Sequence, residues 1–192
     1  ELIVGYFGFL NLSKGGEVLM QAMKLLRDAG RSARLLLVGG RTGTSDPTNA
    51  AYASQVDALI KILDLQSQVT ATGYLDPAAA SRALLACDVI ALPYVDGASL
   101  RRGSLMAALA HGRPIVTTEP RYPIEGLSHA QSAWFVPPND PAALAAAIDE
   151  VLDKAELRAQ LERGAAAAAR LYTWDQIAAR TMDVYESVVS GA

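Results

Sequence analysis

The chain has 192 residues, of which 51% are hydrophobic and 19% are charged, and its formal net charge is −3. This length is enough for one domain with a sizeable core, and the small negative charge argues against nucleic acid as a partner. No stretch approaches the roughly 20 apolar residues of a membrane span. The one cysteine, Cys87, cannot form an internal disulfide, which fits a reducing compartment.

Short apolar runs alternate with longer helical segments along the chain. Because these runs lack polar alternation, they are typical of strands buried on both faces. The predicted strands are Leu2–Phe7, Ala33–Val38, Val69–Thr72, Val89–Leu92, Ile115–Thr117 and Ala133–Val136. The predicted helices are Glu17–Ala29, Asn49–Leu63, Pro77–Ala86, Ser104–His111, Pro141–Leu152, Ala155–Leu171 and Thr173–Val189. The alternation predicts a doubly wound α/β domain, a mostly parallel six-stranded sheet with helices on both faces.

Ligands of such sheets bind outside the carboxyl ends of the strands, so the loops after the strands are the candidate site. The first loop, GFLNLSKGGE, places Lys14 at the start of the next predicted helix. A lysine there is unfavourable for the helix dipole, which suggests an anionic ligand; the alternative is a solvated lysine. The loop is not a Walker A motif, because the Gly-x-x-x-x-Gly-Lys-Ser/Thr pattern is absent.

The stretch Tyr94–Thr118 contains a loop, a predicted helix and the next predicted strand. Arg101, Arg102 and Gly103 stand directly before the helix predicted from Ser104. A helix start offers unpaired N–H groups and a partial positive charge, and two arginines beside it indicate a seat for a phosphate or diphosphate. The alternative is a capped helix with two solvated arginines.

Two further loops carry weaker signals. Gly39, Gly40 and Gly43 form only part of a dinucleotide fingerprint, because a valine stands where the first glycine should be. A flexible loop is therefore the better interpretation. After the third predicted strand, Tyr74 and Leu75 could flank a planar base or could be ordinary turn residues.

The remaining polar residues form no catalytic pattern. Glu125 could face the cleft or cap a short turn, and His129 is interpreted as a surface residue. His111 falls in the last turn of a predicted helix, where an imidazole complements the dipole, so a structural role is favoured. The sequence has no Asp-x-Asp triplet, no His/Cys metal spacing and no Gly-x-Ser-x-Gly elbow. It therefore gives no support for a metal-dependent or serine-hydrolase activity.

The order and spacing of these segments resemble the C-terminal, donor-binding domain of the retaining group 1 (family 4) glycosyltransferases, which have two Rossmann-like domains (the GT-B fold). The resemblance covers essentially the whole chain, from FGFLNLSKGGEVLMQAM through LLLVGG, VTATGYL, ACDVIALPY and MAALAHGRPIVTT to WFVPPNDPAALAAAI and YTWDQIAARTMDVY. It implies one Rossmann-like domain over residues 1–192 that binds a nucleoside diphosphate sugar without a metal or other cofactor.

The same resemblance implies that the full-length enzyme transfers a hexose to an acceptor sugar or lipid-linked sugar in polysaccharide biosynthesis. The acceptor domain would lie upstream, so the chain by itself is expected to bind donor without turnover. We expect a cytoplasmic location, with the full-length protein able to lie peripherally at the inner membrane face.

The resemblance also assigns residues. Lys14 matches the family lysine that binds the donor diphosphate, and Arg101, Arg102, Gly103 and Ser104 would complete that site. Tyr74 and Leu75 fall in the region of the base.

Three family positions are altered. The family has two glutamates eight positions apart, one at the donor sugar and one at the ribose, and they align with Ser99 and Ala107. A family cation expected near Asn11 is also missing. Two interpretations remain open: a subgroup variant in which arginines replace that cation, or a degenerate module that makes protein–protein contacts without binding donor. The apolar face of the last predicted helix also fits the second interpretation, a module that makes protein–protein contacts. A third interpretation, an NAD-type dehydrogenase, is supported only by the incomplete glycine fingerprint.

Overall fold

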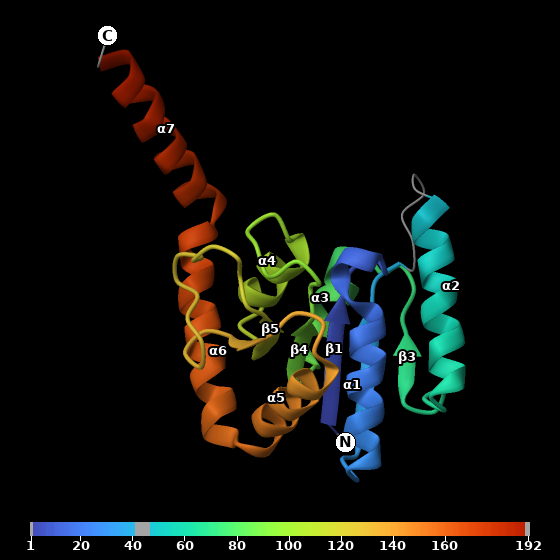
Figure 1. The fold of residues 1–192 in the computed structure, drawn as a ribbon. Helices are drawn as coiled ribbons and strands as arrows, with labels where there is room; N and C mark the ends of the chain where they lie inside the picture. The colour runs from blue at the N-terminus through green and yellow to red at the C-terminus, as the bar shows by residue number, and fades with distance from the viewer. Residues whose placement is uncertain (1, 41–46, 191–192) are drawn as a thin grey trace.

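The computed structural model of the chain describes residues 2–40 and 47–190. Their strands form one sheet in the order β3-β2-β1-β4-β5-β6, and every pairing between these strands is parallel (Figure 1). The strands are β1 (Leu2–Phe7), β2 (Ala33–Val38), β3 (Val69–Ala71), β4 (Val89–Leu92), β5 (Ile115–Thr118) and β6 (Trp134–Val136). The predicted doubly wound, six-stranded sheet is therefore confirmed.

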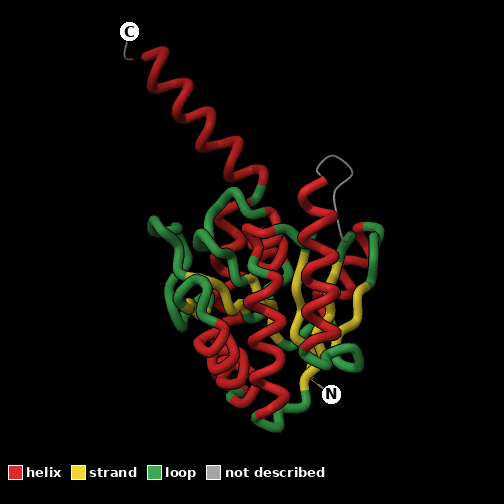
Figure 2. Tube along the Cα trace, turned by 45° about the vertical axis from the view of Figure 1, so that its right-hand side comes forward, coloured by secondary structure: helices red, strands yellow, loops and turns green. Residues whose placement is uncertain are grey.

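Helices connect the strands and cover both faces of the sheet (Figure 2). They are α1 (Gly16–Asp28), α2 (Pro47–Ile62), α3 (Pro77–Leu85), α4 (Gly103–Ala110), α5 (Pro141–Asp153), α6 (Ala155–Ala169) and α7 (Trp174–Ser190). The predicted bounds hold to within about two residues, with two corrections. The helix predicted to Leu171 ends at Ala169 and continues as the 3₁₀ helix η2 (Arg170–Tyr172), and the 3₁₀ helix η1 (Leu12–Lys14) was not predicted.

The core lies in two clusters, one on each face of the sheet, because successive strand residues point to opposite faces. In β4, Val89 packs with α1 and α5 on one face, while Ile90 packs with α4 and α6 on the other. Each of these strand residues is fully buried. Burial on both faces is why the strands show no polar alternation in the sequence.

The sheet order places a topological switch point beside β1. The chain builds β1, β2 and β3 in one direction and then returns to the other side of β1 to form β4. The loops that follow β1 and β4 are therefore neighbours at the carboxyl edge of the sheet, where ligands of such folds bind.

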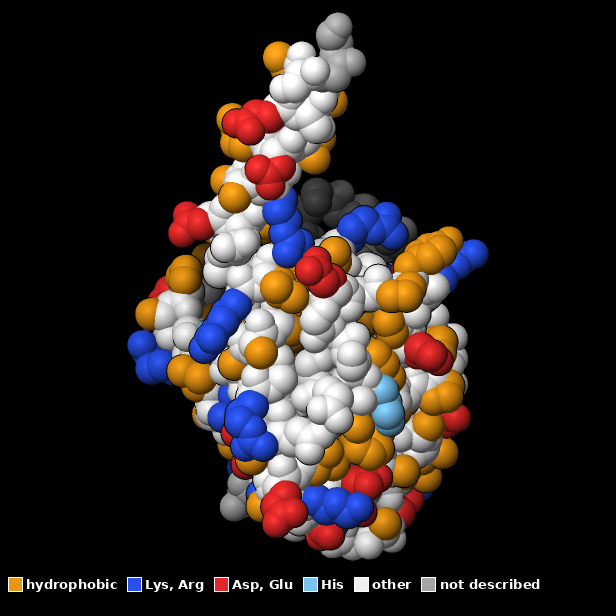
Figure 3. Space-filling model, turned by 90° about the vertical axis from the view of Figure 1, so that its left-hand side faces the viewer, with side chains coloured by type: hydrophobic (Ala, Val, Ile, Leu, Met, Phe, Trp, Pro, Cys, Tyr) orange, Lys and Arg blue, Asp and Glu red, His pale blue; other side chains and the backbone are white. Residues whose placement is uncertain are grey.

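The last helix, α7, projects away from the rest of the fold (Figure 1). Its apolar side chains are exposed, with Trp174 84% and Val188 67% accessible, and Figure 3 shows hydrophobic side chains along it. Its base is held by an ion pair of 2.9 Å between Arg180 and Glu125. Glu125 therefore anchors α7 and neither faces the cleft nor serves as a cap. No helix among the described residues is long and apolar enough to cross a membrane.

A close approach between α6 and the loop before β6 generates a stability prediction. A Cβ added to Gly164 would lie 2.0 Å from the carbonyl oxygen of Gln131. Gly164→Ala should therefore push the loop away and lower the free energy of unfolding by about 1–3 kcal/mol, measured by urea denaturation. Gly103→Ala is the control, because an added Cβ there meets no atom within 4 Å. Equal stabilities for the two variants would contradict this packing.

Candidate functional site

Two loops at the switch point are bound to each other. The backbone N–H of Val95, after β4, donates to the carbonyl of Ser13, after β1, over 3.1 Å. Gly15 has a positive φ of 66°, and a Cβ there would lie 1.9 Å from the carbonyl oxygen of Pro93. Only glycine allows this approach, which explains why Gly15 stands at this position of the first loop.

Arg102 joins the same two loops through its side chain. Its guanidinium donates to Ser13 Oγ over 2.8 Å and forms an ion pair with the Asp96 carboxylate. It also lies over the Tyr94 ring, with the guanidinium carbon 4.9 Å from the ring centroid. The side chain is 16% accessible, so these contacts hold the charge at a fixed place.

Lys14 lies beside Arg102 as a second, half-buried cation. Its ammonium lies over Gly8, such that a Cβ on Gly8 would be 2.4 Å from Nζ. Burial lowers the pKa of Lys14, and the positive charge of Arg102 lowers it further. Among the described residues no carboxylate pairs with Lys14. Of these two neighbouring cations only Arg102 is paired with a carboxylate, that of Asp96, so the site favours an added anion.

The start of α4 faces the same place. Gly103, the first residue of α4, is exposed, whereas Ser104 is buried. The Cβ of Ser104 is 3.9 Å from the position that a Cβ on Gly8 would take. The Ser104 hydroxyl, however, lies 2.8 Å from the hydroxyl of Tyr94 in a buried pair. Burial raises the pKa of Tyr94 to about 12, so the tyrosine stays neutral at physiological pH.

The structure separates the two arginines that the sequence analysis placed in one diphosphate site. Arg102 turns toward Ser13 and Lys14, whereas Arg101 is exposed. Arg101 lines a different groove of about 360 Å³, together with Arg121 and Tyr122 from the loop after β5. Arg101 lies in a turn that the Arg102 N–H closes by donating to the Ser99 carbonyl over 3.1 Å, so the two neighbouring side chains point in different directions.

A cavity of about 370 Å³ lies on the other side of Gly8, over the ends of β1, β2 and β3. Tyr74 and Leu75 line it, as do Gly39 and Gly40. Tyr74 is 84% accessible, so its ring is free to contact a ligand. The predicted base region and the lysine loop therefore share Gly8 as a common wall. Gly43 lies outside the described residues.

The three positions where family residues are altered lie on different elements. Ser99 lines the same groove as Arg101. Ala107 lies in the middle of α4, half-buried against the core. The Asn11 side-chain oxygen accepts a hydrogen bond of 2.9 Å from the Ser13 hydroxyl. The described contacts thus tie Asn11 to the loop that carries Lys14.

Other titratable groups have structural roles. His111 Nδ1 lies 2.7 Å from the Ala107 carbonyl, and Nε2 lies 2.8 Å from Ser81 Oγ. Because a carbonyl only accepts, Nδ1 carries the proton of the neutral ring, and His111 joins α4 to α3. Burial raises the pKa of the Cys87 thiol to about 11, so it is a poor nucleophile.

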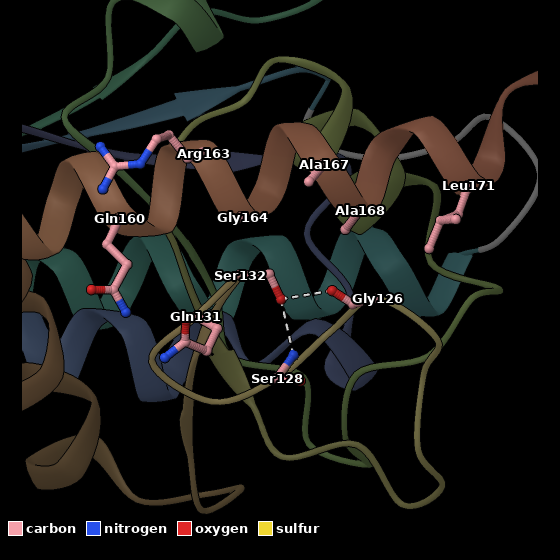
Figure 4. Close-up of a pocket in the computed structure, with 10 residues that line it drawn as sticks. All are labelled: Gly126, Ser128, Gln131, Ser132, Gln160, Arg163, Gly164, Ala167, Ala168 and Leu171. Atoms are coloured by element: carbon pink, nitrogen blue, oxygen red, sulfur yellow. Dashed lines mark hydrogen bonds between the residues drawn. The ribbon is translucent and has the colours of Figure 1, made fainter.

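A wider cavity of about 710 Å³ lies between α6 and the loop before β6, away from this edge (Figure 4). The Ser132 hydroxyl holds that loop by donating to the Gly126 carbonyl and accepting from the Ser128 N–H, each over 2.9 Å. Arg163 is the one charged side chain in its lining. It therefore lacks the convergent charged groups present at the switch point.

The residues of the candidate region that were not predicted from the sequence are Ser13, Tyr94, Asp96, Arg121 and Tyr122. Arg121 and Tyr122 follow a predicted strand, so the rule that ligands bind after the strands already pointed to their loop. The roles of Tyr94 and Asp96 depend on the orientation of Arg102, which only the folded chain determines.

The sheet order and the flanking helices are those of a Rossmann-like domain, and the cationic switch point lies at the edge where such domains bind ligands. The family model described as "Glycosyl transferases group 1" matches residues 1–154, and this chain belongs to that family. Over 89% of its length it superposes on the C-terminal domain of a group 1 protein from Francisella tularensis, with 15% identity, a TM-score of 0.75 and 85% of that chain covered.

The chain is also similar to part of two longer proteins. The chain is 29% identical over 177 residues to a phosphatidyl-myo-inositol mannosyltransferase of Mycobacterium leprae, covering 92% of this chain and 44% of that protein. It is similar in fold to Anabaena HepE, solved in complex with UDP-glucose, with 20% identity, a TM-score of 0.78, and 98% and 49% of the two chains covered. The chain thus spans less than half the length of each of these two proteins.

The half-buried charge of Lys14 predicts a gain in stability when it is removed. Lys14→Met should raise the free energy of unfolding at neutral pH by about 0.5–2 kcal/mol, measured by urea denaturation without ligand. Because the folded state lowers the pKa of Lys14, wild-type stability rises as pH climbs from that lowered pKa toward the unfolded value of 10.5. The advantage of the variant should therefore shrink at alkaline pH.

Lys24→Met is the matched control. Lys24 is exposed and paired with Asp28, so its removal should bring no gain. A Lys14→Met variant that is less stable than the wild type would contradict the description of Lys14 as an uncompensated cation.

Proposed function

We propose that this chain binds the nucleoside diphosphate of a nucleotide sugar, as the donor-binding domain of a glycosyltransferase. The observation that carries the proposal is Lys14, a half-buried cation with no carboxylate partner among the described residues, placed at the switch point beside Arg102. A diphosphate there would offset both charges. It would also accept a hydrogen bond from the N–H group of the exposed Gly103 at the start of α4.

The order of the pockets along the sheet edge supports the same arrangement. The cavity of Tyr74 and Leu75 lies on the β2 and β3 side of Lys14 and suits a planar base stacked on an aromatic ring. HepE, which has this fold, was solved with UDP-glucose, and we take a donor of that class for this chain. Ser99, Ala107 and Asn11 have no carboxylate for the sugar or ribose hydroxyls, so we assign those contacts to hydroxyl, amide and backbone groups.

The charge arrangement also suits the chemistry of sugar transfer. Negative charge grows on the leaving diphosphate as the glycosidic bond breaks, and Lys14, Arg102 and the α4 amides would stabilise it without a metal ion. Retaining transfer of a hexose to an acceptor sugar or lipid-linked sugar would require a second domain. We therefore propose one donor-binding domain over residues 1–192, which binds donor without turnover by itself.

A second candidate function has one observation in its favour. The exposed apolar face of α7 is an unpartnered surface among the described residues, as expected of a module that binds another protein. A module that only binds protein would have no use for the uncompensated Lys14. A measurement of nucleotide binding therefore distinguishes the two candidate functions.

Calorimetric titration with UDP, GDP and ADP tests donor binding directly, and at least one of them should bind. Lys14→Met should weaken that ligand by about 1.5–3 kcal/mol, or about 10- to 150-fold, because a charge-assisted hydrogen bond is lost. Lys24→Met should bind like the wild type. If none of the three nucleotides binds at millimolar concentration, the donor-binding function is wrong and the module that binds protein is favoured.

The base cavity generates a second binding prediction. Tyr74→Ala should weaken the preferred nucleotide by about 1–3 kcal/mol, because a stacking surface for the base is lost. The affinity for inorganic pyrophosphate, which has no base, should not change. Tyr122→Ala removes an exposed tyrosine from the other groove and should leave UDP, GDP and ADP binding unchanged. An equal loss for pyrophosphate and nucleotide would contradict the assignment of the base to this cavity.

A further inference from the structure

A second groove opens at the same edge of the sheet, on the β5 side of Arg102. Its walls come from the loop after β4, residues 96–101, and the loop after β5, residues 121–124, and it encloses about 360 Å³. The loop after β4 is bound to the end of β5: Ala98 N–H donates to the Thr118 carbonyl over 3.3 Å. A Cβ on Gly97 would lie 2.6 Å from the Glu119 carbonyl oxygen, so this contact is close. The groove therefore has fixed backbone walls.

The groove has an excess of positive charge. Arg101 and Arg121 both line it, both are exposed, and neither has a carboxylate partner among the described residues. Asp96 is its one acidic lining residue, and that carboxylate is already paired with Arg102. Two arginines are well suited to a carboxylate or phosphate, which they bind through paired N–H groups.

An aromatic ring lies beside these charges. Tyr122 is 72% accessible, and the guanidinium carbon of Arg121 is 5.9 Å from its ring centroid. An exposed tyrosine offers an apolar face and a polar hydroxyl at low conformational cost. The C–H face of a sugar ring fits such a surface, so the groove offers contacts for both a sugar ring and a negative charge.

The position of the groove relates it to the proposed donor site. From β3 to β5 the sheet order gives four inter-strand steps of about 4.8 Å, or about 19 Å in all, comparable to an extended nucleotide sugar. A base over β2 and β3 and a diphosphate at Lys14 place the next group of the ligand, the reacting sugar, at this groove. This step rests on the proposed function.

We propose that this groove selects a sugar that carries a negative charge, a carboxylate or a phosphate. Arg101 and Arg121 pair with that charge, and the Tyr122 ring packs against the sugar. The charged sugar is either the one attached to the nucleotide, as in a uronic acid donor, or the acceptor that meets it. Arg101 therefore acts in sugar selection, and Lys14 and Arg102 hold the diphosphate.

Calorimetry on the full chain tests the donor source with two pairs of probes: UDP-glucuronate against UDP-glucose, and GDP-mannuronate against GDP-mannose. The charged member of at least one pair should bind at least tenfold more tightly. Arg101→Gln and Arg121→Gln should each remove most of that preference while leaving the affinity for UDP or GDP within about twofold. Arg163→Gln, at the cavity beside α6, should keep the preference.

The acceptor source is tested by titrating glucose 6-phosphate, glucuronate and glucose, both alone and with saturating UDP or GDP. Preferential binding of a charged sugar that disappears in Arg101→Gln supports the groove as an acceptor site. Equal binding of charged and neutral sugars in both experiments overturns the inference, as does a preference that survives in the Arg101→Gln/Arg121→Gln double variant. If no nucleotide binds, the proposed function fails, and the free sugars still decide the charge preference of the groove.

Discussion

Arg102 is the residue on which the geometry of the candidate site depends. It lies after β4, yet it donates to Ser13 after β1, pairs with Asp96 and lies over the Tyr94 ring. These contacts are possible because the sheet order makes β1 and β4 neighbours. One side chain thus joins the two loops that define the switch point and fixes a positive charge there. A shorter or more mobile cation would not satisfy the carboxylate, the hydroxyl and the aromatic face together.

The charge of Lys14 destabilises the unliganded fold, and this cost indicates a site that binds an anion. A half-buried ammonium beside a guanidinium loses hydration and meets like charge, and both effects lower its pKa. A residue kept under such conditions is typical of a site whose charge is completed by a ligand. The same reasoning separates this region from the wider cavity beside α6, where hydroxyl and backbone groups satisfy one another (Figure 4).

The candidate binding surfaces lie one after another along the carboxyl edge of the sheet. The aromatic cavity over β2 and β3, the cations at β1 and β4, and the arginine-lined groove at β4 and β5 follow one another in the order of the strands. α7 projects beyond this edge with an exposed apolar face (Figure 1).

The sequence by itself determined the fold class and almost every helix and strand, because burial on both faces of a parallel sheet leaves unbroken apolar runs between helical segments. It also predicted the lysine loop, the Tyr74 region and the arginines before the helix expected from Ser104 as candidate site residues. Only the tertiary structure decided which of these groups meet. Arg101 lines another groove than Arg102, and Arg121 lines that groove as well. Asp96 pairs with Arg102, and Glu125 pairs with Arg180 of α7. The physical reason is that side-chain direction and long-range pairing arise from packing, while local sequence encodes only periodicity and turns.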